Sequence, residues 1–212
     1  MVFEEKEFEC LENLGVKDSK LLSPKKREEL YPKIREKAIF YKVNLVSPAD
    51  IDETSLNQID LQEIISLITK FNPDKVIFDV PTNPAGVANF VKAVRLGLGS
   101  IKAYKPFEGN NPGLDPTQGW RNSEGPMLIG ENKADEKYPI VSAASILAKV
   151  ERDQIISDLH KDYGDFGSGY MSDERTQKFL SAWFAEHGDF PPIVRRKWSS
   201  VRKFLENQQE MF

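Results

Sequence analysis

Sulfur and imidazole side chains are scarce in this chain of 212 residues, which holds one cysteine and two histidines. The lone Cys10 cannot form an internal disulfide and suits a reducing compartment. So few nitrogen and sulfur donors argue against a zinc site. No run of about 18 apolar residues occurs, so we expect no membrane span. The opening MVFEEKEFECLENLG lacks the apolar stretch of a signal peptide, and we expect a cytoplasmic protein.

Several catalytic and nucleotide-binding motifs are also missing. The chain has no Walker A loop and no Gly-x-Ser-x-Gly elbow. The Gly97–Gly99 segment GLG is only a weak echo of a dinucleotide fingerprint, because the third glycine is absent. These absences argue against a P-loop NTPase, an α/β-hydrolase and a dinucleotide-dependent enzyme.

Excess positive charge is absent as well. The chain has 29 basic and 33 acidic residues, a net charge of −4 and a pI near 5.4. This balance argues against a general nucleic-acid binder but permits a local basic patch. One occurs in VRRKWSSVRK, where Arg195, Arg196 and Lys197 are consecutive. A solvated face explains that patch equally well on composition alone.

The apolar period predicts strands that alternate with helices before Pro139 and helices alone after it. The expected helices are Ser23–Ile39, Thr54–Phe71, Asn83–Leu98, Pro139 to about Tyr163, Glu174–His187 and Trp198–Glu210. The expected strands are Tyr41–Ser47, Lys75–Val80 and SIKAY (100–104). We therefore predict an α/β layered core in a single domain, 1–212, whose residues 172–212 form a helical subregion.

Two local features qualify this pattern. Pro32 lies inside the first expected helix and should kink or split it. The segment Lys105–Leu128 is dense in Gly, Pro and Asn and has no apolar period. We expect a long loop there, and loops of that length are usually functional or disordered.

Two aspartates are the main candidates for chemistry. Asp79 ends an expected strand, and Asp135 precedes an expected helix that carries Ser142, Ser145 and Lys149 on one face. Each aspartate alone is more simply read as a turn or helix-cap residue. Together with a polar stripe at a cleft edge, the two carboxylates could hold Mg²⁺. Two carboxylates are a thin set for a pair of ions about 3.5–4 Å apart.

Several ordered blocks make the chain similar to a known family. It resembles type 2 ribonuclease H, the ribonuclease HII family, in a form like its archaeal and eukaryotic members. The resemblance spans about Gly15 to Lys203 outside the long loop. The blocks are GVKDSKLLSPKKREELY, VIFDVP, KADEKYPIVSAASILAKVERD, YGDFGSGYMSDERT and FPPIVRRKW.

The resemblance implies a ribonuclease H-like layered fold with a mixed sheet flanked by helices. It implies two-metal-ion cleavage of RNA in RNA–DNA hybrids and at single ribonucleotides in duplex DNA, with Mg²⁺ or Mn²⁺ and a 5′-phosphate product. Such an activity belongs to DNA replication and repair. The implied partners are those nucleic acids and, through the tail NQQEMF, a sliding clamp. We expect a monomer.

Site residues are carried over by position. Asp79 and Asp135 match the family's third and fourth metal-binding carboxylates, and Tyr170 matches the tyrosine that senses the ribonucleotide–deoxynucleotide junction. Without the resemblance, Tyr170 would be read as packing in a Gly-rich turn. The other expected substrate-binding residues are Asp18, Ser19, Lys20, Ser145, Lys149, Arg195, Arg196 and Lys197.

One departure from the family concerns the metal ligands. The family opens with a strand that carries an Asp-Glu pair followed by Gly-Arg-Gly, and that pair supplies the first two ligands. This sequence has no match to either motif. Glu4, Glu5 and Glu7 lie in the wrong context to replace the pair. We therefore expect that the family's first strand is missing from this sequence.

Three hypotheses remain at this point. The chain is a type 2 ribonuclease H whose N-terminal end is absent from the sequence, which we favour. Alternatively, it is a truncated protein that binds hybrids without cutting them, and turnover by the purified chain would eliminate that hypothesis. A scaffold protein that uses only its C-terminal helices is the third, and it requires that charge changes at 195–197 leave nucleic-acid binding untouched.

Overall fold

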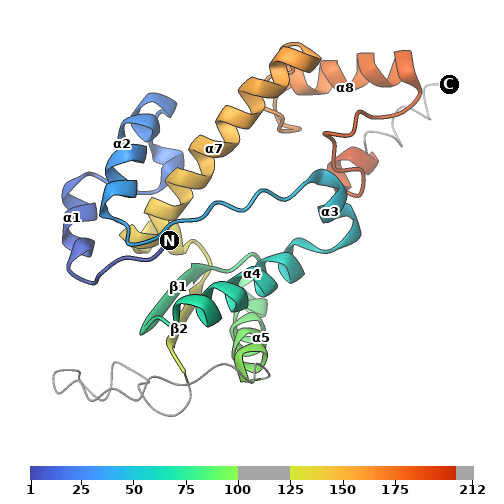
Figure 1. The fold of residues 1–212 in the computed structure, drawn as a ribbon. Coiled ribbons are helices and arrows are strands. Elements are labelled where there is room, and N and C mark those ends of the chain that lie inside the picture. The colour runs from blue at the N-terminus through green and yellow to red at the C-terminus, as the bar shows by residue number, and fades with distance from the viewer. Residues whose placement is uncertain (100–124, 204–212) are drawn as a thin grey trace, which may run out of the picture. The chain divides into compact units, whose positions relative to one another are not determined.

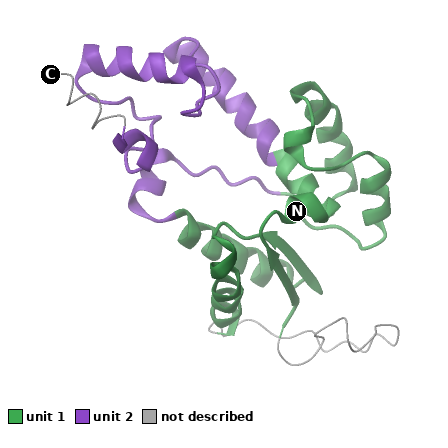
Figure 2. Cartoon of the chain, turned by 180° about the vertical axis from the view of Figure 1, so that it is seen from behind, with its two compact units in different colours: residues 1–41, 56–147 green, residues 42–55, 148–212 purple. Residues whose placement is uncertain are grey.

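The computed structural model describes residues 1–99 and 125–203. The chain divides into two compact units (Figure 2). Unit 1 comprises Met1–Tyr41 and Leu56–Leu147, and unit 2 comprises Lys42–Ser55 and Ala148–Phe212. This division does not test the predicted single domain, which stays a prediction. Within the described part, no helix is long and apolar enough to cross a membrane.

The described elements form an α/β arrangement rich in helices (Figure 1). Those of unit 1 are α1 (Glu7–Asn13), η1 (Ser19–Leu21), α2 (Pro24–Lys37), α4 (Leu56–Phe71), β1 (Lys75–Asp79), η2 (Pro84–Gly86), α5 (Val87–Gly99), β2 (Met127–Glu131) and α6 (Ala134–Lys137). Those of unit 2 are α3 (Pro48–Glu53) and α8 (Glu174–His187). Helix α7 (Pro139–Tyr163) contributes to both units.

The sheet that the structure describes consists of β1 and β2, which are parallel. Their register pairs Lys75 with Met127 and Asp79 with Glu131. Helices α4 and α5 pack on this sheet through a cluster of buried apolar side chains. Its buried members are Ile68, Phe78, Val80, Phe90, Val94 and Leu98. Burial of this apolar area is the main force that holds the layers together.

A second apolar core of unit 1 joins the N-terminal helices to the start of α7. Leu30 and Ile34 of α2 and Ile146 and Leu147 of α7 are almost completely buried in it, together with Leu11 of α1. The i, i+4 spacing of Leu30 and Ile34 places both on one face of α2. This core fixes the first turns of α7 beside the segment that precedes α2.

Unit 2 has its own core under α8. Leu180, Phe190 and Val201 are buried there. The rings of Phe166 and Phe179 lie 5.3 Å apart, centroid to centroid, and extend this core toward the loop before α8. Gly188 ends α8 in the left-handed conformation, with φ of 70°, which glycine adopts without strain.

The structure confirms most of the expected elements. The predicted helices that begin near residues 54, 83, 139 and 174 correspond to α4, to η2 with α5, to α7 and to α8. The predicted strand at 75–80 is β1. The final predicted helix is described only at 199–203. The expected strand at 100–104, most of the expected loop at 105–128 and the tail NQQEMF lie outside the described residues.

Pro32 was expected to kink or split α2, and the prediction of a split is wrong. Ser23 caps the helix and Pro24 is its first residue, as predicted, but one helix then runs to Lys37 through Pro32. Proline deprives the carbonyl of Glu28 of its usual donor. Both Pro32 and Glu28 are exposed, so water can satisfy that carbonyl.

The prediction of a strand at Tyr41–Ser47 is also wrong, because that segment has no regular structure. An alternating pattern forms a strand only where another strand pairs with it. In the described chain the nearest pairing is a single antiparallel bridge between Val2 and Phe40. Leu45, in the middle of this segment, is 70% exposed. Strand β2 was not predicted, since its five residues come directly after a segment of loop-like composition.

We expect Gly130→Ala to destabilise the chain. A Cβ at Gly130 would lie 2.7 Å from Val91 Cγ2 and 2.8 Å from the Phe78 ring, so these packed side chains would have to shift. Overpacking of this kind costs about 1–3 kcal/mol. The measurement is the urea midpoint of unfolding. Gly99→Ala, where no atom lies within 4 Å, is the matched control. Equal midpoints for the two variants would contradict this packing.

Candidate active site

The two candidate aspartates lie at the junction where β1 ends and α6 begins. Asp79 is the last residue of β1, and its Oδ1 accepts a hydrogen bond from the backbone N of Ala134 at 3.2 Å. Asp135 is the next residue along α6 and is only 6% exposed. Asp79 is exposed. The carboxyl end of a sheet strand is the usual place for functional groups in α/β folds.

The turn between β2 and α6 is held by Asn132. Its Nδ2 donates to the carbonyl of Val80 at 2.9 Å and to that of Thr82 at 2.7 Å. Lys133, which follows, adopts a left-handed conformation with φ of 58°. A residue with a side chain adopts that conformation at a cost, and such positions gather at functional sites. The turn therefore fixes Asp135 relative to the end of β1.

The polar stripe of α7 predicted that Ser142 faces a cleft, and for this residue the prediction is wrong. Ser142 is buried, and its Oγ donates to the carbonyl of Asp135 at 2.5 Å. This bond ties the first turn of α7 to α6, because a serine hydroxyl can satisfy a carbonyl that α6 leaves open. Ser145, the next residue of the stripe, is partly exposed.

Asp18, Ser19 and Lys20 form a short turn at η1 that lies against this site within unit 1. The Oδ1 of Asp18 accepts from the backbone N of Lys20 at 2.9 Å and so caps η1. The hydroxyls of Ser19 and Ser145 share a hydrogen bond of 3.0 Å. The structure thus brings Ser145, predicted from the α7 stripe, to the turn predicted from the N-terminal block.

Arg27 of α2 supports this turn from below. It is 6% exposed, and its Nη1 donates to the carbonyls of Ser19 at 3.1 Å and Leu22 at 2.6 Å. A buried guanidinium that binds two carbonyls of one turn leaves that turn little freedom, because losing these bonds would strand buried polar groups. Sequence analysis missed Arg27.

The carboxylate of Asp135 has two different environments. Its Oδ2 accepts from the ammonium of Lys20 at 3.4 Å. Its Oδ1 is buried and has no hydrogen-bond partner among residues 1–99 and 125–203. A buried acceptor without a partner is costly, so such an atom in a native fold calls for a ligand that satisfies it. Nearby Lys133 has a raised pKa, caused first by its hydrogen bond to Glu136 and, to a smaller extent, by Asp18 and Asp135.

Tyr170 lies in unit 2, in the loop before α8, and is 41% exposed. The guanidinium of Arg152 lies over its ring, with Cζ 4.1 Å from the centroid, and the Lys149 ammonium lies 5.9 Å away. Arg152 Nη2 also donates to the carbonyl of Ser168 at 2.7 Å. Arg152 therefore fixes both the ring and the backbone of this loop, and sequence analysis did not single it out.

Asp173 orders the same loop from its other end. Its Oδ2 accepts from the backbone N of Ser168 at 2.8 Å, and its Oδ1 accepts from that of Arg175 at 3.0 Å. These bonds to the charged form lower the pKa of Asp173 to about 2. Gly167 leaves no room for a side chain here, since a Cβ would lie 2.6 Å from Asp173 Oδ2.

The basic segment Arg195–Lys197 is engaged by acids of unit 2. The carboxylate of Asp52 accepts from the backbone N of Arg196 at 2.7 Å and from that of Lys197 at 3.0 Å. The guanidinium of Arg196 binds Asp189 at 2.8 Å. Two adjacent N–H groups that bind one carboxylate form an anion-binding concavity. The guanidinium of Arg195 lies 5.4 Å from the centroid of the Trp198 ring.

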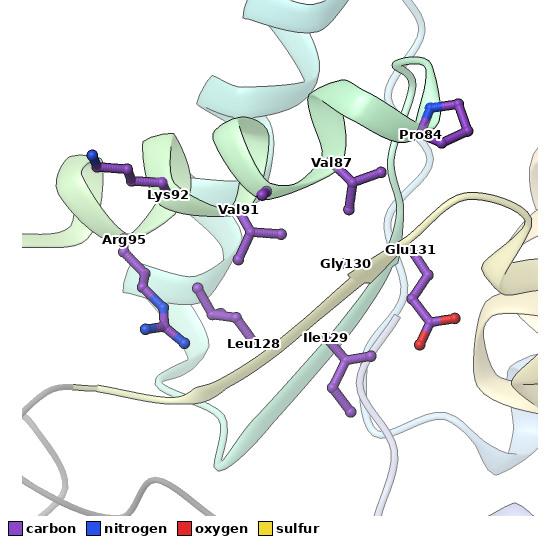
Figure 3. A pocket seen from close by; sticks show the side chains of 10 residues that line it. Pro84, Val87, Val91, Lys92, Arg95, Leu128, Ile129, Gly130 and Glu131 are labelled. Carbon is purple, nitrogen blue, oxygen red and sulfur yellow. The ribbon is translucent and has the colours of Figure 1, made fainter.

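A groove of about 670 Å³ lies between α5 and β2 (Figure 3). Val87 and Val91 of α5 face Leu128 of β2 across it, and Glu131 lies at one end. Hydrogen bonds from Lys137 and then Tyr138 lower the pKa of Glu131. None of the predicted catalytic, metal-binding or substrate-binding residues lines this groove, so it is separate from the candidate site.

Comparisons with known structures first define the class of fold. The crystal structure of the ribonuclease H2 from Pyrococcus horikoshii OT3 matches with a TM-score of 0.75 and 38% identity, over 98% of this chain and 88% of that one. A structure of the PCNA:RNase HII complex from Archaeoglobus fulgidus matches with a TM-score of 0.73 and 34% identity, over 97% and 87%. The chain therefore has the ribonuclease H-like fold that the sequence predicted.

Sequence comparisons then define the family. The ribonuclease HII family profile matches residues 1–94 and 121–201. The Ribonuclease HII of Pyrococcus abyssi is 40% identical over 207 residues, which cover 97% of this chain and 82% of that protein. The chain belongs to the ribonuclease HII family, whose members are hydrolases with RNase H-type endoribonuclease activity. This result confirms the family resemblance.

The predicted site residues are thus divided between the two units. Asp18, Ser19, Lys20, Asp79, Asp135 and Ser145 lie in unit 1, and Lys149, Tyr170 and Arg195–Lys197 lie in unit 2. Asn132, Arg27 and Arg152 were missed, because each binds backbone carbonyls or a ring that only the fold brings near. The blocks KLLSPKKREELY and SILAKVERD contain two of them but carry no signal for those contacts.

We expect acid to loosen the loop before α8. The pKa of Asp173 is lowered from 3.8 to about 2, so its contribution to stability is present above pH 3.8 and is lost as the pH falls through about 2. The measurement is hydrogen exchange of the Ser168 amide, corrected for its intrinsic pH dependence. Asp173→Asn keeps an acceptor oxygen but cannot titrate. Identical pH profiles for wild type and variant would contradict the assignment.

Proposed function

We propose that this chain cuts RNA in RNA–DNA hybrids and at ribonucleotides embedded in duplex DNA, by two-metal-ion hydrolysis that leaves a 5′-phosphate. The observation that carries the proposal is the hydrogen bond that joins Asp79 to the residue before Asp135, whose Oδ1 is buried without a partner among the described residues. Family membership supplies the reaction class.

The residues present fit a divalent cation. Mg²⁺ and Mn²⁺ prefer carboxylate oxygens, and Mg²⁺ is usually held by one or two carboxylates together with waters and substrate phosphates. Asp79 and Asp135 supply two carboxylates, and the orphaned Oδ1 of Asp135 is an oxygen that needs such a ligand. In the described ranges, no group of three or more His, Cys, Asp or Glu side chains could hold a metal. Further donors would therefore come from the substrate and water.

The protein residues have distinct proposed roles. A bound divalent ion would polarise the scissile phosphate and activate water. Asp79 and Asp135 would hold one of the two ions, and the η1 turn with Lys20 and Ser145 lies beside Asp135 in unit 1. Tyr170 packs on a sugar, since the 2′-hydroxyl is the group that separates RNA from DNA.

The basic segment Arg195–Lys197 is proposed to hold phosphates of the duplex backbone. The Asp52 carboxylate accepts hydrogen bonds from two backbone N–H groups of this segment. This contact supports the role, because a phosphate, like a carboxylate, is an anion that accepts hydrogen bonds. Arg196 must leave Asp189 to contribute its guanidinium. The protein is proposed to act as a cytoplasmic monomer in replication and repair. The Archaeoglobus fulgidus complex with PCNA supports a sliding clamp as partner of the tail NQQEMF.

We expect the purified full chain with Mn²⁺ to cut an end-labelled DNA duplex that contains one ribonucleotide. Asp79→Asn and Asp135→Asn should each lower the rate by about 100-fold or more, because a metal ligand acts directly on the reacting phosphate. Glu136→Gln is the matched control, since Glu136 adjoins Asp135 and pairs with Lys133. Duplex binding without any turnover by the wild type would contradict the proposed function.

We expect Arg152→Met to weaken discrimination through Tyr170. Loss of the guanidinium over the ring should lower the preference for a duplex with one ribonucleotide, over plain DNA, by about three- to tenfold. Fluorescence anisotropy measures both affinities. Arg152→Lys should fall between, since it keeps the charge but loses the fork that reaches Ser168.

The role of Arg152 is tested in a second background. Because Arg152 acts through Tyr170, Arg152→Met should add nothing to the loss that Tyr170→Ala causes. The melting temperatures of all variants should stay close together. An equal further loss in the Tyr170→Ala background would contradict the positioning role.

A further inference from the structure

The ammonium of Lys20 occupies one oxygen of a carboxylate that the proposed function assigns to a divalent cation. Its Nζ lies 3.4 Å from the Oδ2 of Asp135, which is nearly buried, whereas the Lys20 side chain is 66% exposed. The other oxygen, Oδ1, is buried and unpartnered. One half of the carboxylate therefore already has a positive partner, and the other half has none.

The backbone that carries Lys20 is held rigidly. Asp18 accepts from the backbone N of Lys20, Arg27 binds the carbonyl of Ser19, and Ser19 binds Ser145 of α7. Only the exposed side chain of Lys20 is free to swing. The ammonium can therefore reach Asp135 reproducibly and can also leave it without any movement of the fold.

We propose that Lys20 is an internal counter-ion that competes with the divalent cation for the Asp135 carboxylate, with the ammonium on Oδ2 and the unpartnered Oδ1 open to the cation. This inference rests on the proposed metal site at Asp79 and Asp135. In the metal-free protein the ammonium reduces the cost of a buried carboxylate, because a charge away from water needs a partner. A divalent ion on the same carboxylate would repel the nearby ammonium, so the ammonium should withdraw as the ion binds.

The competition predicts that the loss of a positive side chain strengthens metal binding. Lys20→Met should lower the dissociation constant for Mn²⁺ by about two- to fivefold, the range that an exposed ion pair contributes. Lys20→Arg keeps a cation in place and should bind Mn²⁺ nearly as the wild type does. The measurement is calorimetric titration of the full chain with Mn²⁺ alone, without nucleic acid.

Lys133→Asn is the matched control for a general effect of charge. Lys133 feels the charges of Asp18 and Asp135, but its ammonium binds Glu136 at 2.8 Å and does not contact Asp135. Asparagine tolerates the left-handed backbone of that position. A gain in affinity for Lys133→Asn as large as for Lys20→Met would overturn the proposal, because contact with Asp135 would then not be its cause.

A second readout follows Lys20 itself. Reductive ¹³C-methylation gives each lysine an NMR signal, and the signal assigned through Lys20→Met should shift as Mg²⁺ is added. The shift should saturate with the calorimetric affinity and should be absent in Asp135→Asn. A Lys20 signal that ignores Mg²⁺, while the protein binds it, would overturn the proposal.

The outcomes separate this inference from the proposed function. If Asp135→Asn abolishes Mn²⁺ binding but Lys20→Met leaves it unchanged, the metal site stands and the competition is wrong. If Asp135→Asn binds Mn²⁺ as the wild type does, the proposed metal site itself is wrong, and the inference about Lys20 falls with it.

Discussion

The hydrogen bond from the backbone of Ala134 to the carboxylate of Asp79 is the contact on which the candidate site depends. It joins the end of β1 to the start of α6, and it places the buried Asp135 one residue beyond that junction. Asn132 closes the same junction from β2 by binding the carbonyls of Val80 and Thr82. Asp79 and the helix that carries Asp135 lie near one another because β1 and β2 are parallel and end at the same edge of the sheet.

The packing of the surrounding helices and strands holds this junction in place. The parallel pair β1 and β2 packs under α4 and α5, where Gly130 allows the helix to approach closely. The core between α2 and α7 fixes Ser145 and Arg27, and these two residues hold the turn that carries Lys20. Apolar burial thus fixes the positions of the helices and strands, and a few buried polar contacts then fix the side chains of the candidate site.

Long elements with a clear apolar period could be predicted from the sequence, whereas the pairing of one strand with another could not. Helices α4, α7 and α8 have enough turns for their period to be recognised, and Pro81 follows shortly after the end of β1. The alternating segment at 41–47 has the period of a strand but no strand beside it, and pairing is a property of the whole fold. Pro32 did not split α2, because an exposed carbonyl can turn to water.

The positions of the two candidate acids could be predicted from the sequence, but the residues that support them could not. Asp79 and Asp135 stand at the ends of recognisable elements within blocks of a known family, and the serine stripe of α7 led to Ser145. The same stripe misplaced Ser142, which turned out to bind the carbonyl of Asp135 in the interior. Arg27 and Arg152 donate hydrogen bonds to backbone carbonyls of loops or turns outside their own helices. The residue type alone does not reveal such a partner.

The central claim is that Asp79 and Asp135 hold one divalent cation together. A double-mutant cycle on Mn²⁺ affinity tests it most directly, with Asp79→Asn, Asp135→Asn and the double variant titrated under identical conditions. The account predicts strong coupling, in which the double variant binds little more weakly than either single variant. Losses that simply add, or single variants that bind as the wild type does, would show that the two carboxylates share no ion.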